Sequence, residues 1–357
     1  MTPATTTMTR DRPHRRDYGL TGADARRAEA TGLANAKWFS ANVPRAALKS
    51  MMQRRNGPAL RDTAIWLAAL AASGGLAAWF WGSAWSIPFF GVYGVLYGSA
   101  SDSRWHECGH GTAFRTRRLN DIVYNIASFM ILREPTVWRW SHARHHTDTI
   151  IVGRDPEILA PRPPDLLGIT LNLFALKAGP KAIAHILLHA TGCLTADEKS
   201  FIPATEQPKV IRTARIWLGL FGAVIALALA TRSFLPLMLV GLPTFYGAWL
   251  QLIFGVTQHS GLAEDVLDHR LNSRTIHMNP VFRFIYWNMN YHVEHHMFPL
   301  VPYHALPQLH AAIGAECPPP YPGLLAAYRE IVPALIRQRR DPTWHIKRRL
   351  PQRAVEA

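Results

Sequence analysis

The sequence predicts an all-α membrane protein, with four transmembrane helices arranged as two hairpins under a cytoplasmic helical cap. Three observations support this fold class. Hydrophobic residues make up 48% of the 357 residues and gather in long blocks, strand-like alternation is weak throughout, and histidines cluster at helical spacing outside those blocks. Together these features favour membrane helices that carry a polar, histidine-rich region on one side.

The first predicted hairpin comprises residues 63–81 and about 84–103. Its first segment, Thr63–Trp81, contains no charged side chain, and a brief turn rich in Gly, Ser and Trp leads into the second segment. Each segment is close to the roughly 20 residues that an α-helix needs to cross about 30 Å of hydrocarbon. We therefore expect the chain to cross the membrane here and return.

The second predicted hairpin comprises residues 214–230 and 234–256, joined only by Thr231-Arg-Ser233. Pro236 and Pro243 should kink the last segment, which membrane helices tolerate. The alternative is that all four segments are buried helices of a soluble protein. Adjacent uncharged pairs joined by very short loops are uncommon in globular cores, so the sequence favours the membrane interpretation.

Four crossings would leave three polar regions on one side of the membrane: residues 1–61, the central loop 104–213 and residues 257–357. Basic side chains concentrate there, at Arg54, Arg55, Arg61, Arg104, Arg212, Arg337, Arg339, Arg340, Lys347, Arg348 and Arg349. The positive-inside rule predicts that both termini are cytoplasmic. We expect the membrane to be a bacterial inner membrane. The formal net charge of +15 follows from this topology and from anionic headgroups, without a nucleic-acid partner.

Three histidine clusters dominate the polar regions: His106-Glu-Cys-Gly-His110, His142-Ala-Arg-His145-His146 and His292-Val-Glu-His295-His296. Residues three and four apart lie on one face of a helix, so each cluster presents its imidazoles together. Imidazole suits iron, copper, nickel and zinc better than magnesium or calcium. Eight imidazoles are too many for one zinc ion and suit two redox metals. The predicted topology brings all three clusters to the same membrane face.

The first cluster also has the form H-E-x-x-H, which in zinc proteases supplies two metal ligands and a general base. That alternative leaves the second and third clusters unexplained. A metal storage or transport protein is a further alternative. Transporters place polar ligands within their membrane spans, however, whereas these clusters lie outside the predicted spans.

The set H-x3-H, H-x2-HH and H-x2-HH resembles the membrane fatty acid desaturase superfamily, in particular its acyl-lipid type, from Arg104 to about Pro307. The resemblance implies a non-haem di-iron centre (Fe2+/Fe3+) that uses O2 as co-substrate, with no catalytic side chain beyond the metal ligands. It implies eight ligands, His106, His110, His142, His145, His146, His292, His295 and His296. The family has one more ligand before the third box, and His259 is the candidate.

Three further phrases, Arg133-Glu-Pro-Thr136, Gly153-Arg-Asp-Pro-Glu157 and Asn288-Met-Asn-Tyr-His292, are similar to a bacterial subgroup typified by the rhizopine-catabolism oxygenase. The superfamily implies desaturation of a fatty acyl chain. The subgroup implies hydroxylation or oxidative O-demethylation of a smaller molecule. Because the ligand spacing does not choose between these outcomes, we expect acyl desaturation and keep oxidation of a smaller substrate as the alternative.

Four acidic residues near the clusters are candidates for accepting the second ring N–H of a ligating histidine: Asp148, Asp155, Glu157 and Glu294. Such contacts fix the tautomer of a metal-binding imidazole. The alternative is that some of them pair with Arg144 or Arg154 at the surface. His185 and His189 also stand four apart, but their segment has the pattern of an amphipathic helix lying on the membrane, which we prefer to a metal pair.

The sequence has no cytochrome b5-like His-Pro-Gly-Gly, no Cys-x2-Cys knuckle and no Gly-x-Gly-x-x-Gly loop. We therefore expect electrons to come from a separate donor protein, a ferredoxin or rubredoxin served by an NAD(P)H reductase. A basic cytoplasmic face would attract an acidic ferredoxin. Membrane lipid is the other expected partner.

Overall fold

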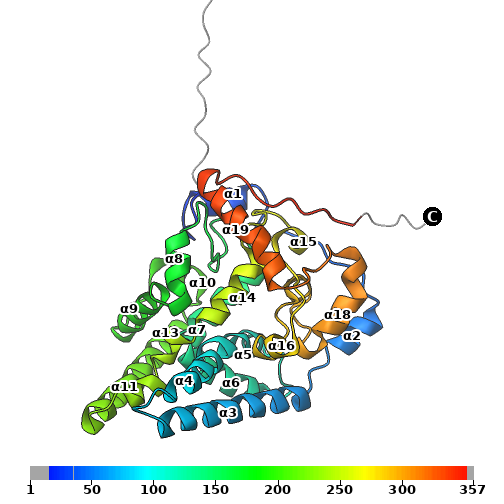
Figure 1. The fold of residues 1–357 in the computed structure, drawn as a ribbon. Helices are drawn as coiled ribbons and strands as arrows, with labels where there is room; N and C mark the ends of the chain where they lie inside the picture. The colour runs from blue at the N-terminus through cyan, green and yellow to red at the C-terminus, as the bar shows by residue number, and fades with distance from the viewer. Residues whose placement is uncertain (1–15, 35, 352–357) are drawn as a thin grey trace, which may run out of the picture.

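The computed structural model describes residues 16–34 and 36–351, and the secondary structure of these residues is helical (Figure 1). Their only strand-like pairings are two isolated bridges, Thr275 with Tyr291 and Ile276 with Tyr321. The all-α prediction is confirmed. Predictions that fall on residues 1–15, 35 and 352–357 lie outside the described part of the chain.

The helices have these bounds in chain order: α1 Ala23–Ala30, α2 Arg45–Met51, α3 Asn56–Trp79, α4 Ser86–Gly94, α5 Ala100–Gly109, α6 Arg117–Met130, α7 Pro135–Thr147, α8 Leu166–Leu171, α9 Ala178–Ala190, α10 Ala196–Phe201, α11 Gln207–Thr231, α12 Leu235–Leu239, α13 Pro243–Tyr246, α14 Trp249–His259, α15 His269–Asn272, α16 Pro280–Ile285, α17 His292–Met297, α18 Leu306–Ile313 and α19 Leu324–Arg340. A π-helical turn covers Val95–Ser99, and short 3-10 turns cover Asn172–Phe174, Tyr303–Ala305 and Gly314–Glu316. Helices α3 and α11 are the longest of the described residues.

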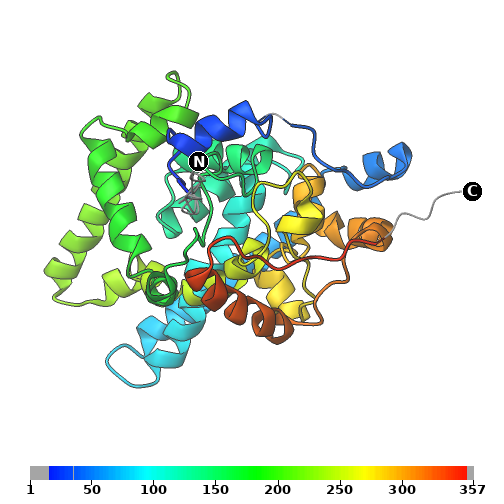
Figure 2. The same cartoon turned by 90° about the horizontal axis from the view of Figure 1, so that it is seen from above.

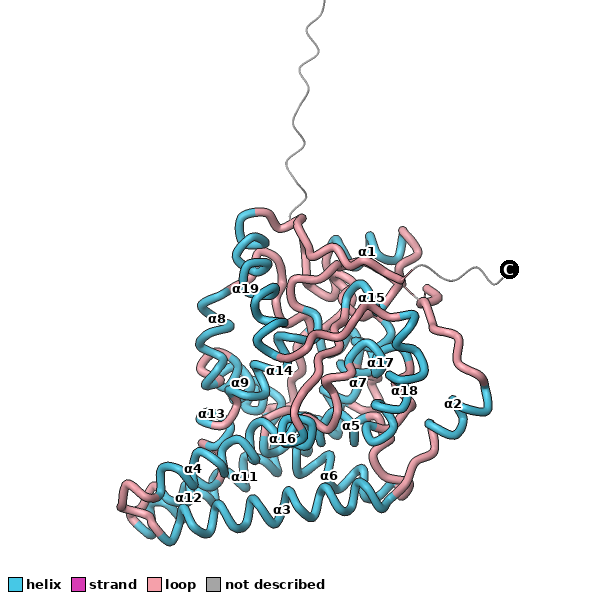
Figure 3. The backbone as a smooth tube through the Cα atoms, turned by 45° about the vertical axis from the view of Figure 1, so that its right-hand side comes forward, coloured by secondary structure: helices cyan, strands magenta, loops and turns pink. Residues whose placement is uncertain are grey.

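Helices α3 and α4 pack side by side at the first predicted hairpin (Figure 3). Gly74 of α3 faces α4 so closely that a Cβ there would lie 2.8 Å from a ring carbon of Tyr93. After α4, the π-helical turn and α5 continue the path to Gly109 without an intervening loop. The hairpin and the first histidine box therefore share one continuous helical path.

The predicted segment 234–256 is not one kinked helix but three pieces, α12, α13 and most of α14. Pro236 and Pro243 each stand in the first turn of a new helix, where a missing backbone N–H costs nothing. Gly241, between them, has a φ of 94°, which ends the preceding helix. The kink expected at Pro243 is thus a complete break between α12 and α13, whereas Pro236 marks the beginning of the first helix of the segment.

A close backbone crossing explains why the chain bends again before α14. Gly247 lies against Gly94 of α4, where a Cβ would be 1.8 Å from the Gly94 carbonyl oxygen. Ser99 Oγ donates to the Gly247 carbonyl at 2.6 Å and accepts from the Gln251 N–H at 2.9 Å. This crossing fixes α14, and hence His259 at its end, relative to α5.

Helix α11 is the one helix of the described residues that is long and apolar enough to cross a membrane by itself. Helices α8 and α9 would qualify only as a single unit, and they are bent by 76°. Only 11% of the apolar window of α11 is buried, and Leu220, Ile225 and Leu229 are among its exposed side chains. A contiguous apolar face of this kind indicates contact with lipid or another protein. The four-span topology stays a prediction.

Arg104, which we expected on the basic cytoplasmic face, is instead fully buried. Its Nη1 donates to the carbonyl of Ile285 at 2.8 Å and to that of Ala100 at 3.0 Å. Its guanidinium carbon lies 4.9 Å from the centroid of the Trp287 ring. Because a guanidinium is planar and weakly hydrated, it packs well on aromatic faces. Arg104 therefore joins α5 to the end of α16 and does not add to the basic surface.

The ends of the two hairpins and the histidine-bearing helices lie in different parts of the molecule. The α3–α4 and α11–α12 turns are both at the lower left of Figure 1, whereas α5, α7 and α14 lie in its middle. Helices α1, α15, α18 and α19 surround this middle region (Figures 1 and 2). Its packing uses buried aromatic residues, including Trp105, Tyr124, Phe254 and Trp287.

Candidate metal centre

The nine histidines that the sequence singled out lie on four helices, except His110, which directly follows one of them. His106 lies on α5 and His110 directly follows it; the second box lies on α7 and the third on α17. His259 is the last residue of α14. Spacings of three and four residues place the histidines of each box on one helical face, as expected. The tertiary fold then turns these faces toward one another.

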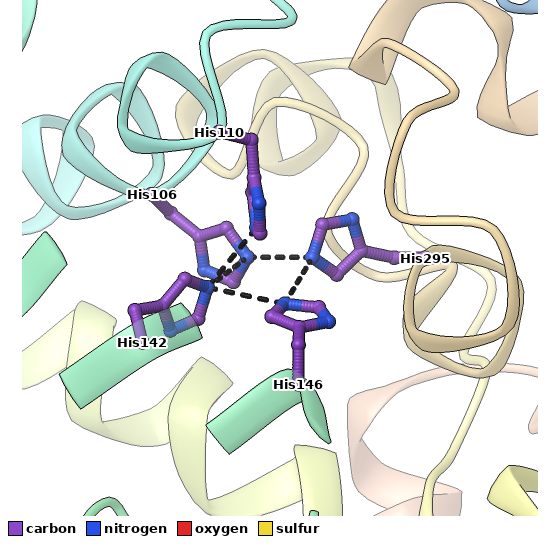
Figure 4. Close-up of side chains that lie close together, drawn as sticks. All are labelled: His106, His110, His142, His146 and His295. Carbon is purple, nitrogen blue, oxygen red and sulfur yellow. Dashed lines mark hydrogen bonds between the residues drawn. The ribbon is translucent and has the colours of Figure 1, made fainter. Parts of the chain in front are cut away.

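Five of the nine imidazoles form the first group, His106, His110, His142, His146 and His295 (Figure 4). The Nε2 atom of His106 lies 2.7 Å from Nε2 of His295 and 3.2 Å from that of His142. The His142 Nε2 atom lies 3.1 Å from Nε2 of His110. The ligand atoms of the five residues all lie within 4.8 Å of one another.

The other four imidazoles form the second group, His145, His259, His292 and His296. Nε2 of His292 lies 2.9 Å from Nε2 of His259 and 3.0 Å from Nε2 of His296. The two groups adjoin, because the rings of His146 and His296 stack with their centroids 4.4 Å apart. The fold thus brings together every residue predicted as a ligand, in two neighbouring clusters that we call the histidine cage.

Four cage histidines have an acceptor on Nδ1, the ring nitrogen that points away from the cluster. Glu157 lies 2.9 Å from Nδ1 of His142 and Asp155 lies 2.8 Å from Nδ1 of His145. The carbonyl of Asn272 lies 2.8 Å from Nδ1 of His259. Carboxylate and carbonyl oxygens only accept, so these Nδ1 atoms carry the proton and Nε2 keeps its lone pair.

The fourth of these contacts involves a hydroxyl group. Thr149 Oγ1 donates to the carbonyl of His145 at 2.7 Å, so its lone pairs are free to accept from Nδ1 of His296 at 3.2 Å. Nδ1 of His146, His292 and His295 has no protein partner. Part of the cage is therefore oriented by side chains behind it, and part by packing alone.

Burial and mutual crowding keep most of the cage neutral. Burial lowers the pKa of His106, His110, His146, His259, His292, His295 and His296 well below the ordinary value, and neighbouring imidazoles lower it further. His145 is different: burial lowers its pKa, but the Asp155 carboxylate more than offsets this and the net shift is upward.

This chemistry fits metal ions. Metal ligation requires a neutral imidazole with a free lone pair, and here several such lone pairs face one another at 2.7–3.2 Å without enough N–H groups between them. A cation between the nitrogens removes that repulsion. All-imidazole donor sets suit iron, copper or zinc, not magnesium or calcium.

The four predicted acidic partners divide into two pairs. Asp155 and Glu157 lie against cage histidines, as described above. Asp148 instead accepts from Arg154 Nε at 3.1 Å, and Glu294 accepts from Thr275 Oγ1 at 2.5 Å and contacts His310. The expectation that all four serve the cage is corrected for Asp148 and Glu294, because Asp148 pairs with Arg154 and Glu294 bonds to Thr275 and His310.

Glu107, the glutamate of the H-E-x-x-H pattern, also faces away from the cage. Its Oε1 accepts from Thr112 Oγ1 at 2.5 Å and from the Tyr303 N–H at 3.1 Å. Burial raises its pKa to about 7. A general base must reach a metal-bound water, and Glu107 is engaged elsewhere. The geometry thus disfavours the zinc-protease alternative.

Sequence reasoning missed three residues that support the cage: Thr149, Asn272 and His269. Besides its contact with His259, Asn272 donates through Nδ2 to the Thr149 carbonyl at 3.1 Å. His269 is buried between Trp38 and His296, with ring centroids 4.2 Å and 5.1 Å away, and burial lowers its pKa to about 3. None stands at a diagnostic spacing, so no sequence signal identified them.

A cavity of about 160 Å³ adjoins both histidine groups. The cage residues that line it include His106 and His142 from the first group, and His145 and His292 from the second. Its other walls combine the aromatic rings Trp105 and Trp138 with charged side chains, namely Asp102, Arg133, Glu157, Arg162 and Glu264. A substrate in this cavity would lie beside both clusters.

Comparison with known proteins gives one family. A family model described as fatty acid desaturase matches residues 92–327. A chloroplastic omega-3 fatty acid desaturase of Glycine max is 25% identical over 221 residues, covering 56% of this chain and 48% of that protein. A probable fatty acid desaturase of Sorghum bicolor is 26% identical over 275 residues, covering 69% and 67%.

A third relative, an endoplasmic-reticulum acyl-lipid omega-3 desaturase (cytochrome b5) of Arabidopsis thaliana, is 26% identical over 220 residues and covers 56% of each chain. The chain thus spans about half of the length of the first of these relatives. The family match includes all three boxes and His259, and it confirms the superfamily resemblance, whereas the rhizopine-type subgroup stays a prediction. With more than half of its residues matched by that family model, this chain belongs to the membrane-associated fatty acid desaturase family of oxidoreductases.

Proposed function

We propose that the nine-histidine cage binds two iron ions and that the protein uses O2 and two electrons to oxidise an unactivated aliphatic C–H bond. The observation that carries this proposal is the convergence of nine buried or partly buried imidazoles, from three boxes and the end of α14, into neighbouring groups of five and four. When bound, such a pair of irons supplies the O2 activation and the oxidising power that protein side chains lack. Desaturation converts –CH2–CH2–, O2, two electrons and two protons into –CH=CH– and two waters.

In this proposal the chain's own residues orient the ligands and exclude water. Glu157 and Asp155 hold the rings of His142 and His145 by their Nδ1 atoms. The Asn272 carbonyl does the same for His259. Ligands held in this way need no reorientation when metal binds, which preserves affinity and geometry.

The leading substrate is a fatty acyl chain of a membrane lipid. Two relatives carry names that describe acyl-lipid omega-3 desaturases. The exposed apolar side chains of α3 and α11, among them Leu67, Leu76, Leu220 and Leu229, support a position in the bilayer where acyl chains are present. We propose that the four apolar segments cross this bilayer and that both termini are cytoplasmic.

A second candidate is hydroxylation or oxidative O-demethylation of a smaller, polar substrate by the same centre. The cavity beside the cage favours it. Arg133 Nη1 donates to Asp102 at 2.5 Å, and its guanidinium lies 4.4 Å and 4.8 Å from the ring centroids of Trp105 and Trp138. A methylene chain gains nothing from charged walls, whereas a polar molecule can exchange hydrogen bonds with them.

We also propose that electrons come from a separate protein. The names of two relatives include cytochrome b5 or ferredoxin as donor. With a formal net charge of +15, this chain should attract an acidic donor such as a ferredoxin, and the rate of association should fall as ionic strength rises.

Metal analysis tests the centre. Protein purified without oxygen should contain two irons per chain, and Mössbauer spectra should show nitrogen-ligated high-spin iron. A chain that takes up no iron under these conditions, or that binds only zinc, would overturn the proposal.

The substrate requires a second experiment, in which lipids and medium are compared between cells with and without the chain. New acyl double bonds support the leading substrate. Released formaldehyde or a hydroxylated small molecule, with unchanged lipids, supports the second candidate.

A further inference from the structure

A second cluster of metal-type ligands lies apart from the cage, between α9 and α10. His185 and His189 stand four residues apart on α9, and Glu198 lies in the first turn of α10. Glu198 Oε1 is 3.1 Å from Nδ1 of His185 and 3.0 Å from Nε2 of His189. The sequence alone favoured a membrane-surface helix over a metal pair here, but the position of Glu198 changes that preference. We propose that these three side chains form a separate binding site for a divalent transition metal, with zinc as the preferred ion.

The ligand set and spacing suit zinc. Two imidazoles and one carboxylate, with an open fourth position, are a recurrent zinc environment. The three ligand atoms lie within 4.8 Å of one another. Tetrahedral zinc, with bonds of about 2.0–2.2 Å, needs ligand atoms about 3.4 Å apart, so the observed contacts require only a slight expansion. The carboxylate also distinguishes this site from the all-nitrogen cage.

Glu198 is held in position before any ion binds. Its Oε2 accepts from the backbone N–H of Thr195 at 2.8 Å and from its hydroxyl at 2.9 Å. In return, Thr195 Oγ1 accepts from the Glu198 N–H at 3.2 Å and completes a capping box. These bonds occupy Oε2 and leave Oε1 to face the two imidazoles. Thr195 therefore orients the Glu198 carboxylate, in the way that hydrogen-bonding residues around a metal site orient its ligands.

The surroundings of His189 provide a second, independent indication. His189 is 2% exposed, and its Nδ1 atom has no partner. Glu134 is buried nearby and its Oε1 also lacks a partner. Burial raises the pKa of Glu134, and an electrostatic interaction with His189 offsets part of that rise, which indicates that the two side chains are close. An ion on Nε2 would leave the ring proton on Nδ1, where it can donate to an acceptor such as Glu134, as metal-ligating histidines commonly do.

The site is open to solvent on one side, and an ion bound there would also affect the packing of α7. The His185 side chain is 34% exposed, so an ion can enter from that side and keep a water as its fourth ligand. Near α10, Ile202 and Leu194 pack with Val137 of α7, the helix that carries the second histidine box. An ion that joins α9 to α10 would thus brace one side of α7 without contacting the cage.

The experiment uses the full chain, first loaded with iron without oxygen and then equilibrated with Zn2+ and freed of excess metal. Elemental analysis should find one zinc per chain beyond the irons, and Zn2+ should raise the Tm. The double variant His185→Ala/His189→Gln should lose that zinc and the rise in Tm while keeping its iron. His304→Ala, which removes a half-buried histidine outside both clusters, should behave as the unaltered chain.

Replacing buried His189 risks unfolding α9, so His185→Ala is also tested alone with Co2+. The absorption spectrum of the Co2+-loaded unaltered chain, after subtraction of the spectrum of this variant, should show the visible bands of cobalt in a site of low coordination number. Equal zinc content in the unaltered chain and both variants, or no cobalt difference spectrum, would overturn the proposal. The comparison counts only ions held by these residues, so its outcome is separable from whether the cage holds iron.

Discussion

The histidine cage and the small cluster of His185, His189 and Glu198 use the same local device in different ways. Both place histidines four residues apart on one helix face. The cage joins residues as distant in sequence as His106 and His295, which are 189 positions apart. The small cluster lies within residues 185–198. Local helical spacing therefore creates a pair of ligands, but only long-range packing creates a nine-ligand centre.

The two regions also differ in where the carboxylate lies. In the cage, Glu157 and Asp155 contact the outer Nδ1 atoms and leave Nε2 for metal. In the small cluster, Glu198 faces both imidazoles directly. A carboxylate behind the ligand tunes and orients it, whereas a carboxylate among the ligands adds a negative charge to the site, as in zinc sites with two histidines and one glutamate. This contrast predicts effects of very different size.

The largest effect is expected for His295→Ala. Nε2 of His295 contacts both His106 and His146, at 2.7 and 3.2 Å, so its loss opens the first group on one side. Iron content and turnover should fall together. The loss in turnover should exceed about 100-fold, which is the largest loss typical of residues that only hydrogen-bond to a metal ligand. Iron analysis and product formation on one preparation measure both. Normal iron content with normal turnover would remove His295 from the ligand set, and exposed His277→Ala is the control.

Glu157→Gln should have an intermediate effect. Glutamine keeps the volume and an acceptor oxygen near His142 Nδ1 but loses the negative charge that strengthens this bond. We expect about a 10- to 100-fold loss in iron affinity or turnover, measured by competition with a chelator and by turnover. Asp148→Asn is the matched control, because Asp148 is an even more buried carboxylate of the same segment but bonds to Arg154 rather than to the cage. Equal losses in both variants would contradict the special role of Glu157.

The parts of the cage that the sequence could predict are those encoded locally. Three- and four-residue spacing identified the eight box histidines, and the family resemblance added His259. Asp155 and Glu157 were among four equivalent acidic candidates, because nothing in the sequence shows that Asp148 lies beside Arg154 or Glu294 beside Thr275. Choosing between them requires the tertiary fold.

The fold was predictable to a similar degree. Hydropathy identified the helical segments and proline marked where the last one would bend. It did not show that Gly247 would pack against Gly94, or that Arg104 would be buried among aromatic rings. Both depend on close contacts between segments far apart in sequence, to which local patterns are insensitive.

A smaller effect, confined to the small cluster, is expected for Glu134→Gln. The amide retains an acceptor for the Val137 N–H at the start of α7 but removes the charge near His189. Zinc affinity should fall by about tenfold, the lower range for outer partners, while iron content stays unchanged. Competition with a zinc chelator measures the first and elemental analysis the second.

Asp165→Asn provides the control for Glu134→Gln, because it changes another acidic helix cap, that of α8, whose carboxylate bonds to the Gly168 N–H and to Lys177. It should leave both metals unchanged. Loss of iron in the Glu134 variant would show that the cage depends on the small cluster, contrary to the separation drawn here.

The smallest effect is expected for Glu107→Gln. This variant tests a carboxylate that is neither behind a cage histidine nor among the ligands of the small cluster. Glu107 is adjacent to His106 in sequence, but it bonds to Thr112 and Tyr303 and to no cage histidine. A glutamine carbonyl can accept both bonds, so iron content should be normal and turnover should fall by no more than about threefold, under ~1 kcal/mol of transition-state stabilisation. Steady-state turnover with matched iron loading measures this. A general base in a zinc-protease site would lose most of its activity on this change, so a large loss at full metal content would revive that chemistry for the H-E-x-x-H segment.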